Sequence, residues 1–426
     1  MKLNDAGAGC LSPPASVLLI APSSSYRIGA YASAAASLGV RLVVASDGQY
    51  SLVPEVAEGI HVDFGGPGDA AAKLAAAHAR QPYATVLASD DATVELASQV
   101  AALCGLPHNP LDSARVSRRK DLARARQRAA GLDVPEFALI ELDSGRLATG
   151  DLPPFPCVLK PLALSGSRGV MRVDTPAALD EARVRLRRIV GASDGSAERR
   201  YGLVESFMPG TEVAVEGILS NGQLEILAVF DKPAPLDGPF FEESYYVTPS
   251  RLEAPRLQRV QDCVAAMCAA YGLTTGPVHA ELRVFGDRVR PLELASRTIG
   301  GDCARLLRFG TGHSLEELVL ARALGLSISA RPTDVAGGVL MIPIPRSGVL
   351  RRVEGVLQAL AVPLVEDVFI AAREGHELVA LPEGSSYLGF VFARGPGAAE
   401  VYAALREAHA LLRVVIAPMW RIEVAS

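Results

Sequence analysis

Two glutamates in the middle of the chain have the residue type and spacing to do chemistry together. Glu281 lies in segment 278–285 and Glu293 in segment 289–297, with Gly286-Asp287-Arg288 between them. This pattern predicts a β-hairpin, and a three-residue loop would put Glu281 directly opposite Glu293. A two-residue loop would place the two glutamates on opposite faces, because side chains alternate along a strand. The apolar residues of both segments favour the three-residue loop.

Facing carboxylates repel each other unless a cation lies between them. Mg²⁺ prefers carboxylate oxygens and keeps coordination positions open for phosphates, so this pair, with Arg297 nearby, fits a magnesium–phosphate site. The competing interpretation is a solvated strand face that carries ordinary charges. The hairpin alone does not decide between them.

A loop of small residues follows a predicted strand that ends in a lysine. Lys160 ends this strand, and the loop Leu162–Gly169 contains two serines and two glycines before a strand resumes at residue 170. A glycine-rich turn between two strands can close over phosphates with its backbone N–H groups. The segment is not a P-loop, because the G-x-x-x-x-G-K-[ST] pattern is missing.

Two further glutamates flank a turn at the start of an apolar strand. Glu205 precedes Ser206–Gly210, and Glu212 follows it, just before the strand at residues 213–219. A strand edge, a glycine turn and a glutamate suit an adenine slot with a ribose partner. An ordinary strand–turn–strand is the alternative.

The elements that must position these residues begin with an alternating N-terminal region. Strands are expected at residues 16–21, 41–45 and 85–89, with helices between them, and Asp90-Asp91 is expected to cap the next helix. This alternation predicts a small open parallel α/β domain over residues 1–112. No G-x-G-x-x-G follows its first strand, so a dinucleotide fingerprint is absent.

The rest of the chain has a different pattern. Residues 115–131 predict one basic helix, and short strands separated by glycine turns continue to about residue 330. We expect residues 113–330 to form the nucleotide-binding and catalytic region and residues 331–426 to form a C-terminal α+β domain. The predicted fold class is therefore mixed α/β and α+β.

Composition limits the classes of function. The chain has 426 residues, of which 49% are hydrophobic and 21% charged, and its net charge is −5. This balance favours neither nucleic acid nor an acidic membrane surface as a partner. The six cysteines are scattered without a C-x-x-C pair, which predicts free thiols and no zinc site. No apolar stretch approaches the ~18 residues of a membrane span, so a cytoplasmic protein is expected.

Taken in chain order, these residues resemble the ATP-grasp superfamily. The resemblance is carried by Lys120, Lys160 with its glycine-rich loop, the Glu205 to Glu212 segment, Glu281, and the run from Glu293 through Arg297 to Gly300-Gly301. Within the superfamily the chain is most similar to the L-amino acid ligases, which make dipeptides, and to the carnosine-synthase type. The resemblance implies an ATP-grasp fold and an ATP-dependent ligase that joins a carboxylate to an amine through an acyl phosphate.

The resemblance also implies roles for individual residues. Lys120 and Lys160 would contact the phosphates of ATP, and the loop with Ser165, Gly166, Ser167 and Gly169 would close over them. Glu205, Ser206, Phe207 and Met208 would form the adenine segment, and Glu212 would bind the ribose. Glu281 and Glu293 would hold Mg²⁺ or Mn²⁺, and Arg297 would stabilise the acyl phosphate and the tetrahedral intermediate.

Two features of the resemblance leave questions open. Ala295 stands where many ATP-grasp enzymes carry an asparagine metal ligand, which puts metal affinity in doubt. The positions that recognise the first substrate correspond to Glu242, Glu243, Tyr245 and Tyr246, and Gly300 and Gly301 lie near the pocket. The resemblance does not fix which of them acts.

Three functions follow from these observations. The first is an amino acid ligase with a small carboxylate and a small amine as substrates, and homodimers occur among related enzymes. The second is another ATP-grasp enzyme, such as a carboxylase or a ligase for a nucleotide precursor. The third is a non-catalytic ATP-binding module, against which both glutamates and Arg297 argue.

Overall fold

Contacts within the chain define two compact units. A computed structural model describes residues 15–48, 58–144, 152–191, 196–328 and 335–419. One unit contains residues 1–108 and 316–327, and the other contains residues 109–315 and 328–426. The predicted boundary after residue 112 falls in the first turn of α5 (Leu111–Arg118), and the one after residue 330 lies outside the described residues. The three-domain division stays a prediction.

The first unit is built on a parallel sheet, as the sequence predicted. Its strand order is β3-β2-β1-β4, and all three pairings are parallel. Every residue of the inner strand β1 is buried, which explains its uninterrupted apolar sequence. The strands are β1 (Ser16–Ile20), β2 (Arg41–Ser46), β3 (Glu58–His61) and β4 (Thr85–Ala88). The helices are α1 (Arg27–Ser37), α3 (Pro67–Arg80), η1 (Asp91–Thr93), α4 (Val94–Leu103) and α11 (Leu315–Ala323).

The predicted cap at Asp90-Asp91 was wrong. The turn η1 intervenes before α4, and Asp90 makes no side-chain cap. Its carboxylate instead accepts hydrogen bonds from Arg27 Nη1 and Ser25 Oγ, both at 2.6 Å. These tertiary partners outcompete the local capping interaction that the sequence suggested.

The described residues of the second unit form three sheets. Its small antiparallel sheet has the order β5-β8-β6-β7, and α7 covers β6 and β7. Thr175 caps α7, since its Oγ1 accepts a hydrogen bond from the Ala178 N–H at 3.2 Å. The elements here are β5 (Phe137–Glu141), β6 (Cys157–Pro161), β7 (Met171–Val173), α7 (Pro176–Val190), α8 (Ala197–Arg200) and β8 (Tyr201–Ser206).

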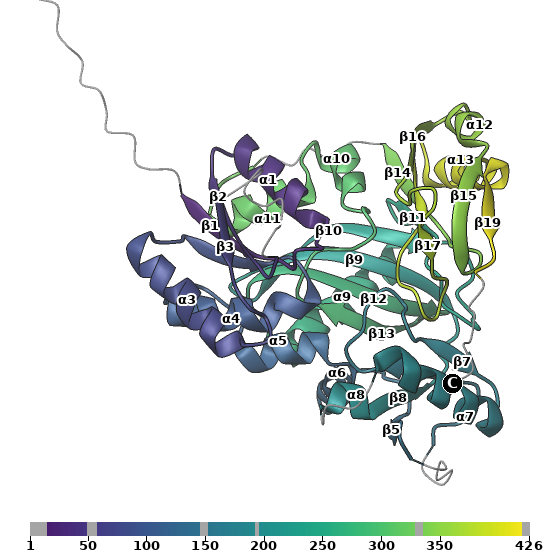
Figure 1. The fold of residues 1–426 in the computed structure, drawn as a ribbon, viewed down its shortest axis with the longest axis horizontal. Helices are drawn as coiled ribbons and strands as arrows, with labels where there is room; N and C mark the ends of the chain where they lie inside the picture. Colours follow the sequence, from purple (N-terminus) through teal and green to yellow (C-terminus); the bar gives the residue numbers. More distant parts are fainter. Residues whose placement is uncertain (1–14, 49–57, 145–151, 192–195, 329–334, 420–426) are drawn as a thin grey trace, which may run out of the picture. The chain divides into compact units, whose positions relative to one another are not determined.

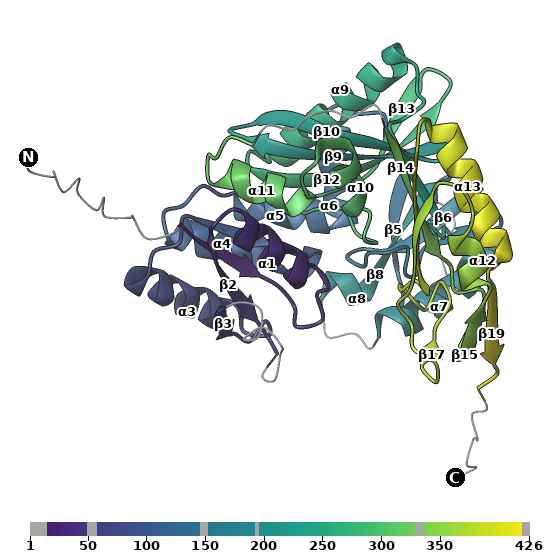
Figure 2. The same cartoon turned by 90° about the horizontal axis from the view of Figure 1, so that it is seen from above.

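An eight-stranded sheet is the largest feature of the second unit (Figure 1). Its order is β13-β12-β9-β10-β11-β14-β18-β16. Its strands are β9 (Thr211–Ser220), β10 (Gln223–Lys232), β11 (Tyr245–Thr248), β12 (Gly276–Phe285), β13 (Arg288–Ala295), β14 (Ala336–Ile342), β16 (Val365–Ile370) and β18 (Gly389–Gly395). The inner eight residues of β9 are buried on both faces. Helix α9 (Ala254–Tyr271) packs against β13, and α10 (Arg305–Thr311) against β14 (Figure 2).

The C-terminal residues continue this sheet and add a small one. Helix α13 (Ala398–Leu411) packs on β14 and β18 around a core that includes Leu340, Val391 and Leu405. The third sheet has the order β17-β15-β19, formed by β15 (Gly348–Glu354), β17 (Glu377–Leu378) and β19 (Arg413–Ala417), and α12 (Val356–Leu360) lies beside α13. These helices and strands agree with the α+β character predicted for the C-terminal residues. Among the described residues, none of the helices combines the length and apolarity that crossing a bilayer requires.

Candidate functional site

The β12–β13 hairpin brings Glu281 and Glu293 directly opposite each other. Residues paired in an antiparallel ladder point to the same face, so both carboxylates lie on one side of the sheet. The predicted pairing is confirmed, but the predicted loop was wrong. The turn has two residues, since Phe285 pairs with Arg288, and a β-bulge at Leu292 shifts the register before the glutamates.

A break between two helices places Lys120 beside Glu293. The single helix predicted at residues 115–131 is two helices, α5 and α6 (Lys120–Ala129), because Arg119 is extended at φ −102° and ψ 106°. The Lys120 N–H donates to Leu162 O at 2.9 Å, a tertiary bond that holds the break. The Lys120 ammonium donates to Glu293 Oε1 at 3.0 Å and to Leu164 O at 2.8 Å.

A buried ion cluster connects Lys160 to the hairpin. Glu205 lies between Arg124 Nε and Lys160 Nζ, each 2.5 Å from one of its oxygens. Arg124 Nη1 also donates to Pro291 O at 3.1 Å, and its Nη2 donates to Leu292 O at 3.0 Å, at the bulge. Side chains of this cluster line one small cavity together with those of Lys120 and Glu293. The two lysines predicted to bind phosphate therefore lie in the same place as the second glutamate of the pair.

Glu205 should make the folded protein sensitive to acid. Burial works to raise the pKa of its carboxyl, but Arg124 and Lys160 outweigh burial and lower the pKa from 4.5 to about 2. The folded protein therefore binds this proton more weakly than the unfolded chain. The stability from Glu205 is complete above about pH 4.5 and is lost as the pH falls towards about 2, a total of about 3 kcal/mol.

Urea unfolding of Glu205→Gln and wild type across acidic pH measures this contribution. Near neutral pH we expect the variant to be less stable by about 3 kcal/mol, because two buried cations lose their partner. The difference should shrink below about pH 4.5. Glu141→Gln is the control, because the Glu141–Arg200 pair is exposed to solvent and therefore contributes little to stability. A difference between Glu205→Gln and wild type that does not change with pH would contradict the assignment.

A second cluster surrounds Lys232 on the other side of the pair. The Lys232 ammonium lies 2.6 Å from Glu212 Oε1, 2.8 Å from Glu243 Oε1 and 2.7 Å from Glu281 Oε1. Arg283 Nε lies 3.0 Å from the other oxygen of Glu212. Burial and the neighbouring Glu281 raise the pKa of Glu243 to about 7. One ammonium thus holds three carboxylates together.

His279 is a cation of this cluster rather than a base. Its Nδ1 lies 2.9 Å from Glu216 Oε1 and its Nε2 lies 3.4 Å from Glu281 Oε1. Burial works to lower the imidazole pKa, but the hydrogen bonds to Glu216 and Glu281 outweigh it and raise the pKa to about 9. A protonated imidazole cannot accept a further proton, and His279 bridges Glu216 and Glu281 instead.

The donor set fits a hard divalent cation. Oxygens of Glu212, Glu243 and Glu281 all lie within 4.8 Å of one another, and Glu293 faces Glu281 across the hairpin. Carboxylate oxygens at this spacing suit Mg²⁺ or Mn²⁺. The predicted pair therefore belongs to a larger set of acidic groups.

The glycine-rich loop adopts the backbone that its sequence suggested. Gly166, Ser167 and Gly169 have φ values of 62°, 54° and 76°, and Val170 N–H donates to Ser167 O at 3.1 Å. A Cβ on Gly169 would lie 2.9 Å from Leu186 Cδ1, so only glycine fits there without a shift. Ser165 and these residues connect β6 to β7, directly after Lys160 and Leu162.

The predicted adenine segment begins with the last two residues of β8, Glu205 and Ser206. The Ser206 N–H donates to Glu136 O at 2.9 Å and the Phe207 N–H donates to Pro156 O at 2.8 Å. Both donors are therefore used within the protein, and Met208 is buried. The Glu205 and Glu212 side chains belong to the ion clusters described above. The nucleotide roles of this segment stay predictions.

The residues after β13 form a tight turn. Arg297 Nη1 donates to Thr298 O at 2.9 Å, and Arg297 acts electrostatically on the buried Glu216. Gly300 O accepts a hydrogen bond from the Cys303 N–H at 3.3 Å. Gly301 has φ 64°, and a Cβ there would lie 2.2 Å from Met341 Sδ. The turn therefore brings Arg297 near the Glu216–His279 end of the second cluster.

The four candidate substrate residues separate into two groups. Glu243 joins Lys232, and Tyr246 donates its hydroxyl to Glu243 Oε2 at 2.7 Å. Tyr245 points to the opposite face of β11, where its hydroxyl lies 2.6 Å from His409 Nδ1. Burial raises the pKa of the Glu242 carboxyl. The structure therefore brings Glu243 and Tyr246, but not Tyr245, to the carboxylate cluster.

Sequence reasoning missed Lys232, the central cation of the site. A signal was present, because the chain has only five lysines among its 42 basic residues. Three of them, Lys120, Lys160 and Lys232, lie in the two clusters described here. In a chain that otherwise uses arginine, retained lysines are candidates for sites that need a compact charge.

Comparison with known proteins gives two matching family models. The ATP-grasp domain model matches residues 153–305, and the model of L-amino acid ligase C-terminal domain 2 matches residues 340–417. Residues 153–305 are thus an ATP-grasp domain, and residues 340–417 match a domain of the L-amino acid ligases. The first match contains both glutamates of the hairpin, Lys160 and Lys232, and the second begins within β14. The predicted family and fold are confirmed.

Solved structures and curated proteins show the same similarity. An L-amino acid ligase from Bacillus licheniformis aligns with a TM-score of 0.80 at 22% identity, covering 95% of this chain and 100% of that one. An N5-carboxyaminoimidazole ribonucleotide synthetase from Thermotoga maritima aligns at 0.67 and 14% identity, covering 95% and 100%. The uncharacterized protein y4rH of Sinorhizobium fredii is 26% identical over 63% of this chain and 55% of its own length. The ATP-grasp enzyme fsqD of Aspergillus fumigatus is 26% identical over 44% and 32%. The chain thus spans about half or less of the length of these two curated relatives.

Proposed function

We propose that this protein is an ATP-dependent amino acid ligase that forms an amide bond through an acyl phosphate. The observation that carries the proposal is the Glu281–Glu293 pair, with Lys120 on one glutamate and Lys232 on the other. The match to the L-amino acid ligase C-terminal domain supports amino acids as substrates. The cysteines among the described residues are free thiols, which supports a location in the reducing cytoplasm. Homodimer formation stays an expectation.

The proposed first step is attack of a substrate carboxylate oxygen on the γ-phosphorus of ATP, with ADP leaving. Phosphoryl transfer needs in-line positioning and charge neutralisation, which Lys120 and Lys160 provide. Mg²⁺, held by Glu281 and Glu293, would neutralise charge on the phosphates. Glu205 keeps Lys160 in place through the buried ion pair, so its role is positioning.

The proposed second step is attack of the amine nitrogen on the acyl carbon, with phosphate leaving and the amine losing a proton. The carbonyl oxygen becomes negative during this attack, and Arg297 supplies a positive charge near it. The chemistry requires no covalent protein nucleophile. Burial raises the pKa of the Cys303 thiol well above its ordinary value, so this cysteine near the turn is not activated.

A screen of amino acid pairs for phosphate release tests the function. We expect release only when ATP, Mg²⁺ and a suitable pair are present, with one amide formed per phosphate. Mass spectrometry of the product identifies the bond that forms. Release that depends on bicarbonate instead would indicate a carboxylase, and nucleotide binding without release for any pair would indicate a binding module.

A further inference from the structure

A short C-terminal segment touches the glycine-rich loop Ser165–Gly169. The segment Pro382–Ser385, named here the latch segment, lies between β17 and β18. Pro382 O accepts a hydrogen bond from the Gly169 N–H at 2.8 Å, and Glu383 O accepts one from Arg168 Nε at 3.0 Å. A Cβ on Gly166 would lie 3.4 Å from Ser385. Both ends of the loop therefore lie against the latch segment.

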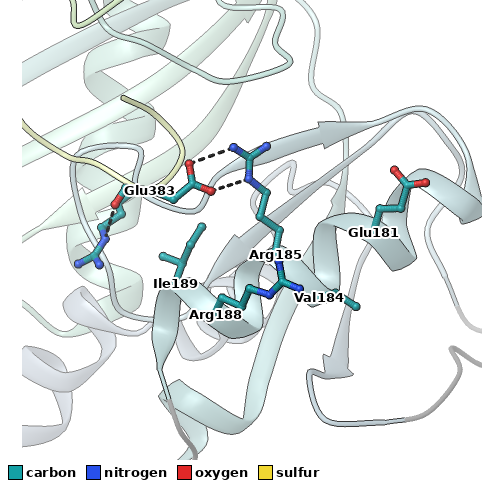
Figure 3. A pocket seen from close by; sticks show the side chains of 7 residues that line it. Glu181, Val184, Arg185, Arg188, Ile189 and Glu383 are labelled. Carbon is teal, nitrogen blue, oxygen red and sulfur yellow. Dashed lines mark hydrogen bonds and ion pairs between the residues drawn. The ribbon is translucent and has the colours of Figure 1, made fainter. Parts of the chain in front are cut away.

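The side chain of Glu383 makes a further contact beside the loop. Its two carboxylate oxygens accept hydrogen bonds from Arg185 Nε at 2.6 Å and Arg185 Nη2 at 2.9 Å. Figure 3 shows Glu383 reaching Arg185 on α7, with Arg188 and Ile189 one turn further along the helix. Arg168, Arg185 and Glu383 line one groove on the protein surface. Arg185 pairing lowers the pKa of Glu383, so the carboxylate is charged at neutral pH.

The latch segment is fixed to the C-terminal part of the chain. The Gly384 N–H donates to Ala380 O at 2.9 Å, and the Ala380 N–H donates to Ser347 Oγ at 3.0 Å. A Cβ on Gly384 would lie 1.9 Å from Val379 O, so the turn is compact. Leu378 and Leu388, on either side, are buried in the C-terminal core. The latch segment is thus anchored by hydrogen bonds to the C-terminal part, while Glu383 reaches across to α7.

Contacts with the latch segment should reduce the conformational entropy that the glycine-rich loop loses when ATP binds. Glycines and serines in positive-φ conformations lose much conformational entropy when they are ordered. A loop that closes over phosphates must become ordered when ATP binds, and contacts that order it beforehand strengthen binding. The loop must also exclude water from a reactive acyl phosphate.

We propose that the latch segment positions the glycine-rich loop for ATP, with the Glu383–Arg185 ion pair as the contact that holds the latch closed. The C-terminal part, matched by the L-amino acid ligase model, then helps to build the nucleotide site of the ATP-grasp part. Glu383 and Arg185 are positioning residues, since neither touches the reacting groups. This inference rests on the proposed function only for its expected effect on the amount of phosphate released per amide formed.

Glu383→Ala tests the latch with two measurements that need no turnover. Hydrogen exchange of the backbone amides at residues 165–169 should become faster, because the latch segment is no longer held over the loop. The dissociation constant for ATP with Mg²⁺, measured by calorimetry, should rise by about threefold, the size expected for an ion pair that is partly exposed. In turnover assays, more phosphate should be released per amide formed.

A charge exchange distinguishes positioning from a general loss of structure. The double variant Arg185→Glu with Glu383→Arg should recover slow exchange and ATP affinity, whereas each single variant should lose both. Glu141→Ala is the matched control, because the exposed Glu141–Arg200 pair joins β5 to the end of α8 in the same unit, at 2.9 Å. It should leave loop exchange and ATP affinity unchanged.

Unchanged loop exchange in Glu383→Ala would overturn the latch. Faster exchange with unchanged ATP affinity would also overturn it, because the loop contact would then serve no nucleotide function. A wild type that binds ATP but turns over no amino acid pair would count against the proposed ligase activity alone, since exchange and binding still report on the latch.

Discussion

Replacing Glu293 by alanine should abolish ATP turnover and leave the fold intact. Glu293 faces Glu281 across the hairpin and accepts a hydrogen bond from Lys120. Its side chain is 35% exposed, and Lys120 keeps its hydrogen bond to Leu164 O when the carboxylate is removed. Loss of a ligand that organises charge around the phosphates costs several kcal/mol in the transition state, which is about a thousandfold in rate or more.

Phosphate release and thermal unfolding, measured on the same samples, check this expectation. Asp287→Ala is the control, because Asp287 lies in the turn of the same hairpin, 79% exposed, and pairs with Arg259. It should retain wild-type turnover. Turnover near the wild-type rate in Glu293→Ala would remove Glu293 from the site, whereas loss of turnover with a large fall in melting temperature would point to structure instead.

The hairpin shows how far the sequence carried the prediction. The facing pair Glu281 and Glu293 could be predicted, because the apolar residues of both strands require a common buried face. The two-residue turn and the β-bulge that produce this strand register could not be predicted. Arg124, far away in sequence, donates hydrogen bonds to the carbonyl oxygens of Pro291 and Leu292, and these bonds stabilise the bulge.

The position of Lys232 could not be predicted, because a β-bulge also changes the register of its strand. The turn at Asn221-Gly222 predicts a hairpin in which Lys232 would lie opposite Thr211. A register shift between Ile226 and Ala228 instead pairs Lys232 with Glu212. Neither local propensity nor spacing reports a bulge, so the residue that joins three carboxylates could not be placed from the pattern.

The helix break at Arg119 has a tertiary cause as well. Residues 115–131 have strong helix formers throughout, and local propensity predicts one helix. The bond from the Lys120 N–H to Leu162 O replaces a helical hydrogen bond. By contrast, β1, β2 and β4 of the first unit were predicted, because each is a short apolar run. The edge strand β3 was missed, because its sequence Glu58–His61 has no such run and is mostly exposed.

Lys232→Met should destabilise the protein by about 3–5 kcal/mol, the second large effect that the structure predicts. The variant leaves the carboxylates of Glu212, Glu243 and Glu281 close together and without their shared ammonium. Methionine fills a similar volume, so the loss reports charge more than packing. Lys73→Met is the control, because Lys73 is exposed and donates to a backbone carbonyl. It should change stability by less than about 0.5 kcal/mol.

Divalent cations should recover part of this loss. A cation that binds the three carboxylates stabilises the folded state in proportion to its concentration relative to its dissociation constant. In wild type the ammonium competes for the same oxygens, so Mg²⁺ or Mn²⁺ should raise the melting temperature more in Lys232→Met than in wild type. Equal responses of the two proteins would indicate that these carboxylates do not bind the metal.

The dependence on pH gives this prediction a definite sign. In wild type the pKa of Glu243 is already raised to about 7 from 4.5, and without the ammonium it should rise further. A carboxyl whose pKa is higher in the folded state binds its proton more tightly there, so the folded state gains stability as the pH falls. The part of the stability difference between Lys232→Met and wild type that comes from Glu243 should therefore be small below about pH 7 and should grow as the pH rises above about 7. Glu243→Gln in the Lys232→Met background should remove most of this dependence, because it removes the carboxyl that titrates first.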